Sequence, residues 1–133
     1  MLRGFLNRAG VLPDQYVFYD GSGLSRQNLA TPHAVVQLLR YAATQPWGNT
    51  FRDTLPVAGV DGSLSDRFKN LSLQGTIHAK TGSLGGVKTL SGYATTESGE
   101  EVCFSILTNN FNLPTKRVTD AIDDVVGAIM SDR

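Results

Sequence analysis

The chain has one cysteine, no long apolar run and no excess of charge of either sign. Because Cys103 is alone, the sequence excludes a disulfide framework and a metal site made of several thiolates. No stretch approaches the roughly 18 consecutive apolar residues of a membrane-spanning helix. Met1 to Leu6 lack the apolar core of a signal peptide. The 12 basic and 12 acidic residues are scattered, so no basic stripe indicates a nucleic-acid partner.

A core is nevertheless expected, because 41% of the 133 residues are apolar. A chain of this length and composition can form one globular domain, which we expect to span residues 1–133. We find no internal repeat, low-complexity tract or interdomain linker. The sequence therefore predicts a single folded unit.

The first half of the chain has helical periodicity, interrupted by one short strand. Apolar residues three or four apart predict a helix that stops at Gly10, and Tyr16 to Tyr19 predict a strand. Thr31 is a good cap and Pro32 a good first residue for the next helix, which must end before Pro46. The expected helical segments are residues 2–9, 32–45, 51–55 and 64–68.

The second half predicts a sheet followed by one helix. Strands are expected at residues 76–80, 87–96 and 101–108, with turns at 82–86 and 97–100. Such short turns imply antiparallel neighbours. After Pro114, apolar residues at Val118, Ile122, Val125 and Ile129 predict a helix with one apolar stripe, which would pack on the sheet. The expected class is α+β: a helical first half, then a three-stranded antiparallel sheet with a C-terminal helix.

Two tetrapeptides are candidates for chemistry. Lys80-Thr81-Gly82-Ser83 ends an apolar strand, and Ser25-Arg26-Gln27-Asn28 follows the glycine-rich turn Asp20-Gly21-Ser22-Gly23. Each has a structural alternative, because the serine segment can be a turn before a capped helix and a lysine at a strand end is often only solvated. Nowhere in the 133 residues is a serine followed three positions later by lysine.

With their neighbouring segments, these tetrapeptides resemble the D-alanyl-D-alanine carboxypeptidase/endopeptidase family, the class C low-molecular-mass penicillin-binding proteins. The segments that carry the resemblance are Asp20 to Arg26, Leu55 to Gly59, Asp61-Gly62-Ser63-Leu64 and Ala79 to Ser83. The resemblance runs from about Leu2 into the third predicted strand and indicates the C-terminal portion of the family's domain. It implies part of the serine β-lactamase/penicillin-binding-protein transpeptidase-like fold.

The resemblance implies a proton-relay role for the serine tetrapeptide. The family's second motif is Ser-x-Asn, and Ser25 takes the place of its serine. Gln27 stands two residues later, where the family has asparagine, and Asn28 follows. We expect Gln27 to supply the amide because it keeps the spacing, with an inward-turned Asn28 as the alternative. Arg26 is then expected to face solvent or the peptide substrate.

The lysine tetrapeptide resembles the family's third motif, which lines the cleft. Lys80 would add positive charge near the substrate carboxylate and the relay, and Thr81 and Ser83 would offer hydroxyl groups. Gly82 would let the substrate approach the backbone, and the main-chain N–H of Ser83 would be one oxyanion donor. The expected catalytic residues are Ser25, Gln27 and Lys80, and the expected substrate-binding residues are Asn28, Thr81, Gly82 and Ser83.

Acyl transfer in this family needs three motifs, and the Ser-x-x-Lys nucleophile is absent from the sequence. We therefore expect the C-terminal part of a serine-type D-Ala-D-Ala carboxypeptidase that acts on peptidoglycan stem peptides and is inactive alone. The alternative is a non-catalytic module of the same fold that binds peptidoglycan peptide or a protein partner. Expected partners are stem peptides ending in D-Ala-D-Ala, β-lactams in the complete enzyme, and a second copy or a complementary N-terminal part. The resemblance implies a periplasmic or other extracytoplasmic location.

Neither a cofactor nor a metal is expected. His33 and His78 have no third ligand at a spacing suited to zinc. The Gly-x-x-x-x-Gly-Lys-Ser/Thr pattern of a phosphate-binding loop is absent, and Lys80 precedes its glycine.

Overall fold

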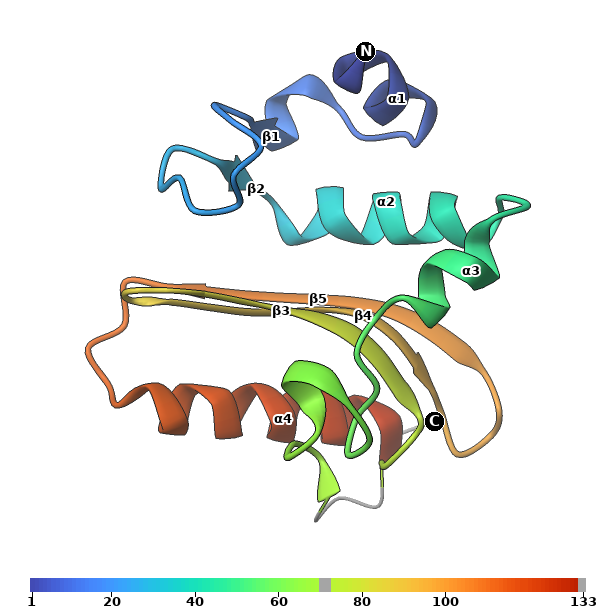
Figure 1. Cartoon of the computed structure of the whole chain (residues 1–133), viewed down its shortest axis with the longest axis vertical. Coiled ribbons are helices and arrows are strands. Elements are labelled where there is room, and N and C mark those ends of the chain that lie inside the picture. Colours follow the sequence, from blue (N-terminus) through green and yellow to red (C-terminus); the bar gives the residue numbers. More distant parts are fainter. Residues whose placement is uncertain (70–72, 132–133) are drawn as a thin grey trace.

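The computed structural model describes residues 1–69 and 73–131, arranged in layers (Figure 1). The central layer is an antiparallel sheet in the order β3-β4-β5, formed by Ile77–Leu84, Val87–Thr95 and Glu101–Asn109. Helix α2 (Pro32–Ala43) lies over one face of the sheet and helix α4 (Thr115–Ser131) over the other. The structure confirms the predicted α+β class with a three-stranded sheet and a final helix.

The N-terminal segment forms a further layer beyond α2. Helix α1 spans Leu2–Arg8 and the 3-10 turn η1 spans Pro13–Gln15, after which strand β1 (Tyr16–Val17) pairs with β2 (Leu29–Ala30). A small core joins this layer to α2 through Leu6, Ala9, Val11 and Ala34. The strand expected at residues 16–19 is therefore only two residues long. Its partner β2 was not predicted, because two residues are too few to show alternation in a sequence.

Helix α2 begins as the sequence predicts. The hydroxyl oxygen of Thr31 accepts a hydrogen bond from the backbone N–H of Ala34 at 3.0 Å, and Pro32 is the first helical residue. On the side of α2 that faces the sheet, the Tyr93 hydroxyl donates to the Leu39 carbonyl at 2.8 Å. Burial raises the pKa of Tyr93 to about 12, so this link between α2 and β4 persists through the neutral range.

The two shorter helical pieces differ from their predictions. Helix α3 spans Gly48–Asp53 rather than 51–55. The segment expected at 64–68 forms only the 3-10 turn η2, Gly62–Leu64. Phe68 has a φ of 65°, which cannot continue a right-handed helix, and its ring is buried in the main core. Burial of this ring outweighs the local helical pattern.

Strand β3 is longer than predicted and includes the whole lysine tetrapeptide. The strand was expected to end at Lys80, yet Thr81, Gly82 and Ser83 all pair with β4, and the register runs to Leu84 opposite Val87. The turn is therefore only Gly85–Gly86, and Gly86 has a φ of 71°. Tight two-residue hairpins require such positive φ values, which glycine adopts without strain.

Helix α4 packs on the sheet through a different line of residues from the one predicted. Val118 and Ile122 are buried as expected, but Val125 and Ile129 are 50% and 37% exposed. Their places in the core are taken by Val126 and Met130, at 0% and 1%. Steps of four residues advance about 40° around a helix, so the buried line winds slowly and follows the twist of the sheet.

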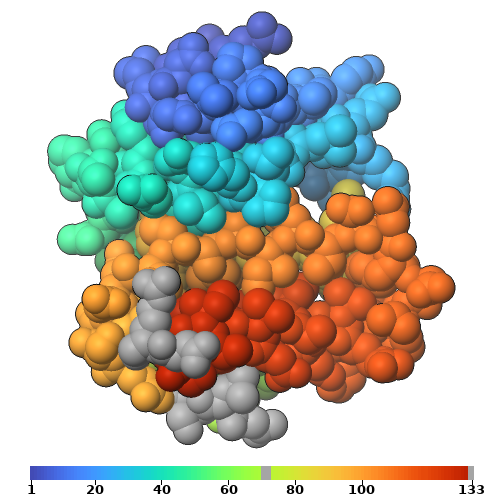
Figure 2. All heavy atoms as spheres, turned by 180° about the vertical axis from the view of Figure 1, so that it is seen from behind, coloured from blue at the N-terminus to red at the C-terminus, as the bar shows by residue number. Residues whose placement is uncertain are grey.

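Strand β5 forms one edge of the sheet. Within the described residues it pairs with β4 alone. Viewed from behind, Figure 2 shows β5 as an orange band at the surface between α2 and α4. No helix within residues 1–69 and 73–131 is long and apolar enough to cross a membrane.

Replacing each of two neighbouring valines on α4 by alanine tests which flank of the helix is buried. Val126→Ala should lower the free energy of unfolding by about 2 kcal/mol, because it leaves a cavity in the core. Val125→Ala, the matched control on the exposed flank, should cost less than about 0.5 kcal/mol. Urea denaturation measures both, and equal losses would contradict the observed orientation.

The open edge of β5 predicts self-association of the 133-residue chain. An unpaired, fully extended edge strand is a template for pairing with a second strand. We expect concentration-dependent dimers in sedimentation velocity, and binding of a hydrophobic dye. A monodisperse monomer that binds no dye would rule this out.

Candidate functional site

The candidate site is built on the outer edge of β3, the edge that faces away from β4. The segment before η2 covers the start of this edge: the N–H of Ala58 donates to the Ile77 carbonyl at 2.9 Å, and the N–H of Ala79 donates to the Pro56 carbonyl at 3.0 Å. Beyond Ala79 no backbone partner continues the pairing among the described residues. The edge is therefore open from Lys80 onward.

The pattern of hydrogen bonds fixes which backbone groups are available on that open edge. Residues of an antiparallel strand alternate, with both polar groups facing either the partner or away from it. Because Ile77 and Ala79 direct theirs away from β4, Thr81 and Ser83 do the same. The N–H of Ser83 is thus directed outward, which is where an oxyanion donor would be needed.

The strand's alternation separates the side chains of the lysine tetrapeptide. Ile77 and Ala79 belong to the core shared with α4, so Thr81 and Ser83 also face α4 and Lys80 faces the side of α2. The Lys80 ammonium donates to the Thr81 carbonyl at 2.7 Å. The four residues therefore offer a cation on one face, hydroxyl groups on the other, and backbone donors between them.

Gly82 packs closely against β4. A Cβ at Gly82 would lie 2.3 Å from the hydroxyl oxygen of Thr89 on β4. The sequence interpretation gave Gly82 a role in substrate approach, which stays a prediction. The structure adds a packing reason that the sequence did not show.

The hydroxyl groups of the tetrapeptide line a pocket of about 200 Å³ on the α4 side. Thr81 donates to the hydroxyl of Ser63 at 3.0 Å, and Arg67 and Lys88 also line the pocket. Ser63 belongs to the segment Asp61-Gly62-Ser63-Leu64, which the sequence had used only for the resemblance. Its position beside Thr81 follows from the loop that also covers the edge of β3.

The serine tetrapeptide lies in a loop held by its own side chains. The Asn28 side-chain oxygen accepts from the backbone N–H of Tyr19 at 2.7 Å, and its amide donates to the Asp20 carbonyl at 3.0 Å. Hydrogen bonds from Ser22 lower the pKa of Asp20, so this carboxylate stays ionised. The Ser25 hydroxyl accepts from the backbone N–H of Gln27 at 3.2 Å. In this structure the Asn28 side chain stabilises the loop.

One hydrogen bond joins this loop to the hairpin end of β3. The Arg26 guanidinium donates to the Gly85 carbonyl at 2.8 Å, across 59 residues of sequence. Arg26 is exposed, as expected, and makes this contact in addition. No sequence pattern indicates this contact, because an arginine within a turn is ordinarily solvated.

The two tetrapeptides line different pockets. Ser25 and Asn28 line a pocket of about 420 Å³ with Leu84, Val87 and other residues. None of Lys80 to Ser83 lines that pocket, and Ser25 does not line the pocket beside Thr81. The relay role of Ser25 and Gln27 and the substrate contact of Asn28 stay predictions.

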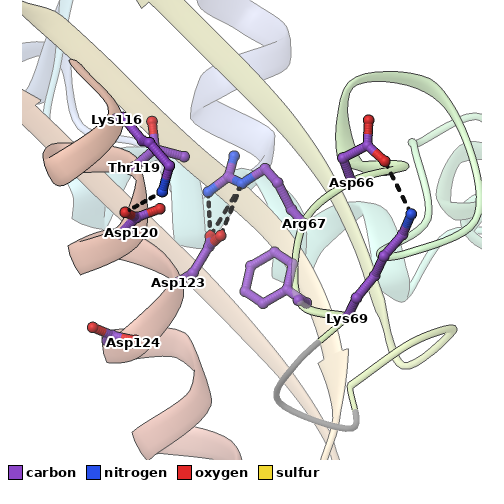
Figure 3. A pocket seen from close by; sticks show the side chains of 9 residues that line it. Asp66, Arg67, Lys69, Lys116, Thr119, Asp120, Asp123 and Asp124 are labelled. Atoms are coloured by element: carbon purple, nitrogen blue, oxygen red, sulfur yellow. Dashed lines mark hydrogen bonds and ion pairs between the residues drawn. The ribbon is translucent and has the colours of Figure 1, made fainter.

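A pocket of about 490 Å³ lies between α4 and the loop after η2 and contains none of the predicted site residues (Figure 3). Its charges are mostly paired: Lys69 with Asp66, and Lys116 with Asp120 (Figure 3). Arg67 pairs there with Asp123 through two of its nitrogens. Burial raises the pKa of Asp123, and Arg67 opposes that shift only in part.

No cluster of His, Cys, Asp and Glu among the described residues forms a metal-binding group. Nδ1 of His78 is buried without a hydrogen-bond partner in this part of the chain.

Comparison with known proteins identifies the family. Residues 1–129 match the model of the D-Ala-D-Ala carboxypeptidase 3 (S13) family. The chain belongs to this family. A D-alanyl-D-alanine carboxypeptidase of Actinomadura sp. (strain R39) is 43% identical over 123 residues, covering 88% of this chain and 23% of that protein. The D-alanyl-D-alanine carboxypeptidase DacB of Haemophilus influenzae is 37% identical over 113 residues, covering 84% of this chain and 24% of its own length.

The chain also superposes on part of several longer proteins of known structure. Penicillin-binding protein 4 (DacB) of H. influenzae superposes with a TM-score of 0.83 at 32% identity, covering 98% of this chain and 31% of that one. The same protein has been solved in complex with a β-lactam. A predatory endopeptidase of Bdellovibrio bacteriovorus, at 24% identity, shares the fold with a TM-score of 0.81. The chain thus spans about a quarter of the curated relatives and about a third of the solved ones.

The link between the two tetrapeptides can be tested by removing its donor. Arg26→Gln should speed amide hydrogen exchange at residues 85–87 roughly fivefold, because the loss of one charged hydrogen bond destabilises the turn locally. Arg40→Gln, an exposed change on α2, should leave these amides unaffected. Unchanged exchange in the Arg26 variant would show that the contact does not hold the hairpin.

Proposed function

We propose that this chain is part of a serine-type D-Ala-D-Ala carboxypeptidase that acts on peptidoglycan stem peptides outside the cytoplasmic membrane. The open edge of β3 from Lys80 to Ser83 is the observation that carries the proposal. A peptide laid along this edge would meet the outward N–H and C=O groups of Thr81 and Ser83, as an added strand does. Membership of the S13 family supports the chemistry.

The reaction in this proposal is acyl transfer through a serine ester. A serine oxygen outside these residues attacks the carbonyl carbon between the two D-alanines, and its proton passes to a base. The N–H of Ser83 stabilises the oxyanion that forms. The C–N bond then breaks, the departing D-alanine amine takes the proton, and water hydrolyses the ester.

The nucleophile is proposed to come from a Ser-x-x-Lys segment encoded in frame with this chain. The 133 residues contain no such pattern, although two elements of the family's site are matched. Lys80 then acts beside the nucleophile by its positive charge, on the side of the sheet covered by α2. Binding of the peptide and formation of the ester are thus assigned to different parts of the protein.

Covalent labelling tests the division of roles. The 133-residue chain incubated with fluorescent penicillin should show no covalent label, because it has no activated serine. A stable label on this chain would show that another of its serines serves as nucleophile, contrary to the proposal.

The in-frame extended protein supplies the positive arm. It should be labelled at the serine of Ser-x-x-Lys, and Lys80→Ala should slow labelling about a hundredfold or more. Lys69→Ala, an exposed lysine away from the β3 edge, is the matched control. If the upstream frame encodes no Ser-x-x-Lys, the chain is a peptide-binding module rather than part of an enzyme.

A further inference from the structure

The hydroxyl group of Thr81 on the open edge of β3 is held by a residue of another element. Oγ1 of Thr81 donates to Oγ of Ser63 at 3.0 Å, across 18 residues of sequence. Ser63 lies in η2, after the segment that covers the start of the β3 edge. A side chain has several staggered χ1 rotamers available, and a fixed hydrogen-bond partner favours one of them. Ser63 can therefore select the direction of the Thr81 hydroxyl.

The core and the backbone make η2 a firm base for the Ser63 hydroxyl. Leu64, the next residue, is 0% exposed and belongs to the main core. Its carbonyl accepts hydrogen bonds from the N–H of Gly59 at 2.9 Å and from the N–H of Arg67 at 3.0 Å. The backbone of Ser63 is thus fixed relative to the sheet, so its hydroxyl has a defined position beside Thr81.

An ion pair joins the loop after η2 to α4. The Arg67 guanidinium donates to the Asp123 carboxylate through Nε at 3.1 Å and also through Nη2 (Figure 3). The two side chains are only 15% and 14% exposed, and removing one partner of such a pair leaves a poorly solvated charge. Arg67 also lines the pocket that Ser63 and Thr81 line. The pair thus connects α4 to the part of the loop that meets β3.

The Asp123 end of this connection responds to acid. Burial raises the pKa of Asp123, the Arg67 guanidinium opposes the shift, and Asp120 and Asp124 on α4 add to it. Other charged side chains line the two adjoining pockets: Asp66, Lys69, Lys88 and Lys116. As the pH falls, Asp123 therefore takes up a proton before an exposed aspartate would, and the charge contact with Arg67 is lost. Because the folded chain binds this proton more tightly than the unfolded chain does, its uptake does not favour unfolding. Acid removes the contact rather than the fold.

We infer that Ser63 is a positioning residue for the β3 edge: its hydroxyl fixes the side chain of Thr81, and the Arg67–Asp123 pair holds the loop that carries it. The effect on the reaction rests on the proposed function, because a peptide laid along β3 would meet Thr81. The coupling of α4 to β3 through this loop is a property of the 133-residue chain itself.

Nuclear magnetic resonance of the 133-residue chain tests the hydrogen bond. Three-bond scalar couplings report the χ1 rotamer of Thr81. We expect single-rotamer values in the unsubstituted chain and averaged values in Ser63→Ala, because loss of one hydrogen bond removes a bias of roughly fivefold between rotamers. Ser63→Thr, which keeps the hydroxyl at an exposed position, should restore the single rotamer.

The same spectra test the ion pair. The amide signals of Ser63 and Thr81 should shift with pH at the midpoint measured for the Asp123 carboxyl carbon, and Asp123→Asn should abolish this titration. Glu101→Gln is the matched control, because it removes another arginine–carboxylate pair, that of Arg52 with Glu101. It should leave the titration and the Thr81 rotamer unchanged.

The in-frame extended protein tests the effect on the reaction. Ser63→Ala should slow labelling by fluorescent penicillin about fivefold, Ser63→Thr should restore the rate, and Glu101→Gln should leave it unchanged.

The outcomes separate the inference from the proposed function. An unchanged Thr81 rotamer in Ser63→Ala would overturn the inference, and so would a titration that persists in Asp123→Asn. An averaged rotamer with an unchanged rate of labelling would overturn the role in the reaction. The expected rotamer and titration, with no label on the unsubstituted extended protein, would support the coupling and count against the proposed function. Retained dispersion of the remaining signals shows that each variant is folded.

Discussion

The site depends on where pairing along the outer edge of β3 stops. The segment from Pro56 to Ala58 runs antiparallel to β3, from Pro56 opposite Ala79 to Ala58 opposite Ile77, and then turns into η2. The N–H of Val57 donates to the Asp61 carboxylate at 2.7 Å, which closes that turn. If the residues before Pro56 also paired with β3, the backbone groups of Thr81 and Ser83 would be occupied. The edge is therefore open beyond Ala79 because this pairing begins only at Pro56.

The alternation of side chains along the strands determines on which face of the sheet each side chain lies. Lys80 belongs to the lysine tetrapeptide on β3, and Lys88 on β4 lies opposite Ser83. Because side chains alternate along a strand, the two lysines lie on opposite faces of the sheet. The two positive charges thus lie on opposite faces of the sheet. The core between the sheet and α4 fixes this division, because Ile77 and Ala79 cannot leave it without exposing apolar surface.

The sequence could predict those features that depend on neighbouring residues. The cap at Thr31 and the three strands between short turns follow from local rules. It could not predict which flank of α4 is buried, because Val125 and Val126 are equally apolar and only the twisted sheet distinguishes them. The same limit applies to the site. The two tetrapeptides indicate one family, but only the fold shows that Ser25 and Thr81 line different pockets.

The hydrogen bond from Arg26 to the Gly85 carbonyl connects the serine loop to the turn between β3 and β4. A two-glycine turn is among the least restrained parts of a sheet, since glycine loses more conformational freedom than any other residue when it is ordered. Only Leu84 separates Ser83 from this turn, so movement of the turn would displace the outward N–H of Ser83. A guanidinium reaching from an independently stabilised loop restrains it from outside the sheet. Asn28 and Asp20, which hold the loop, therefore act on the β3 edge through Arg26, although neither lines the pocket beside Thr81.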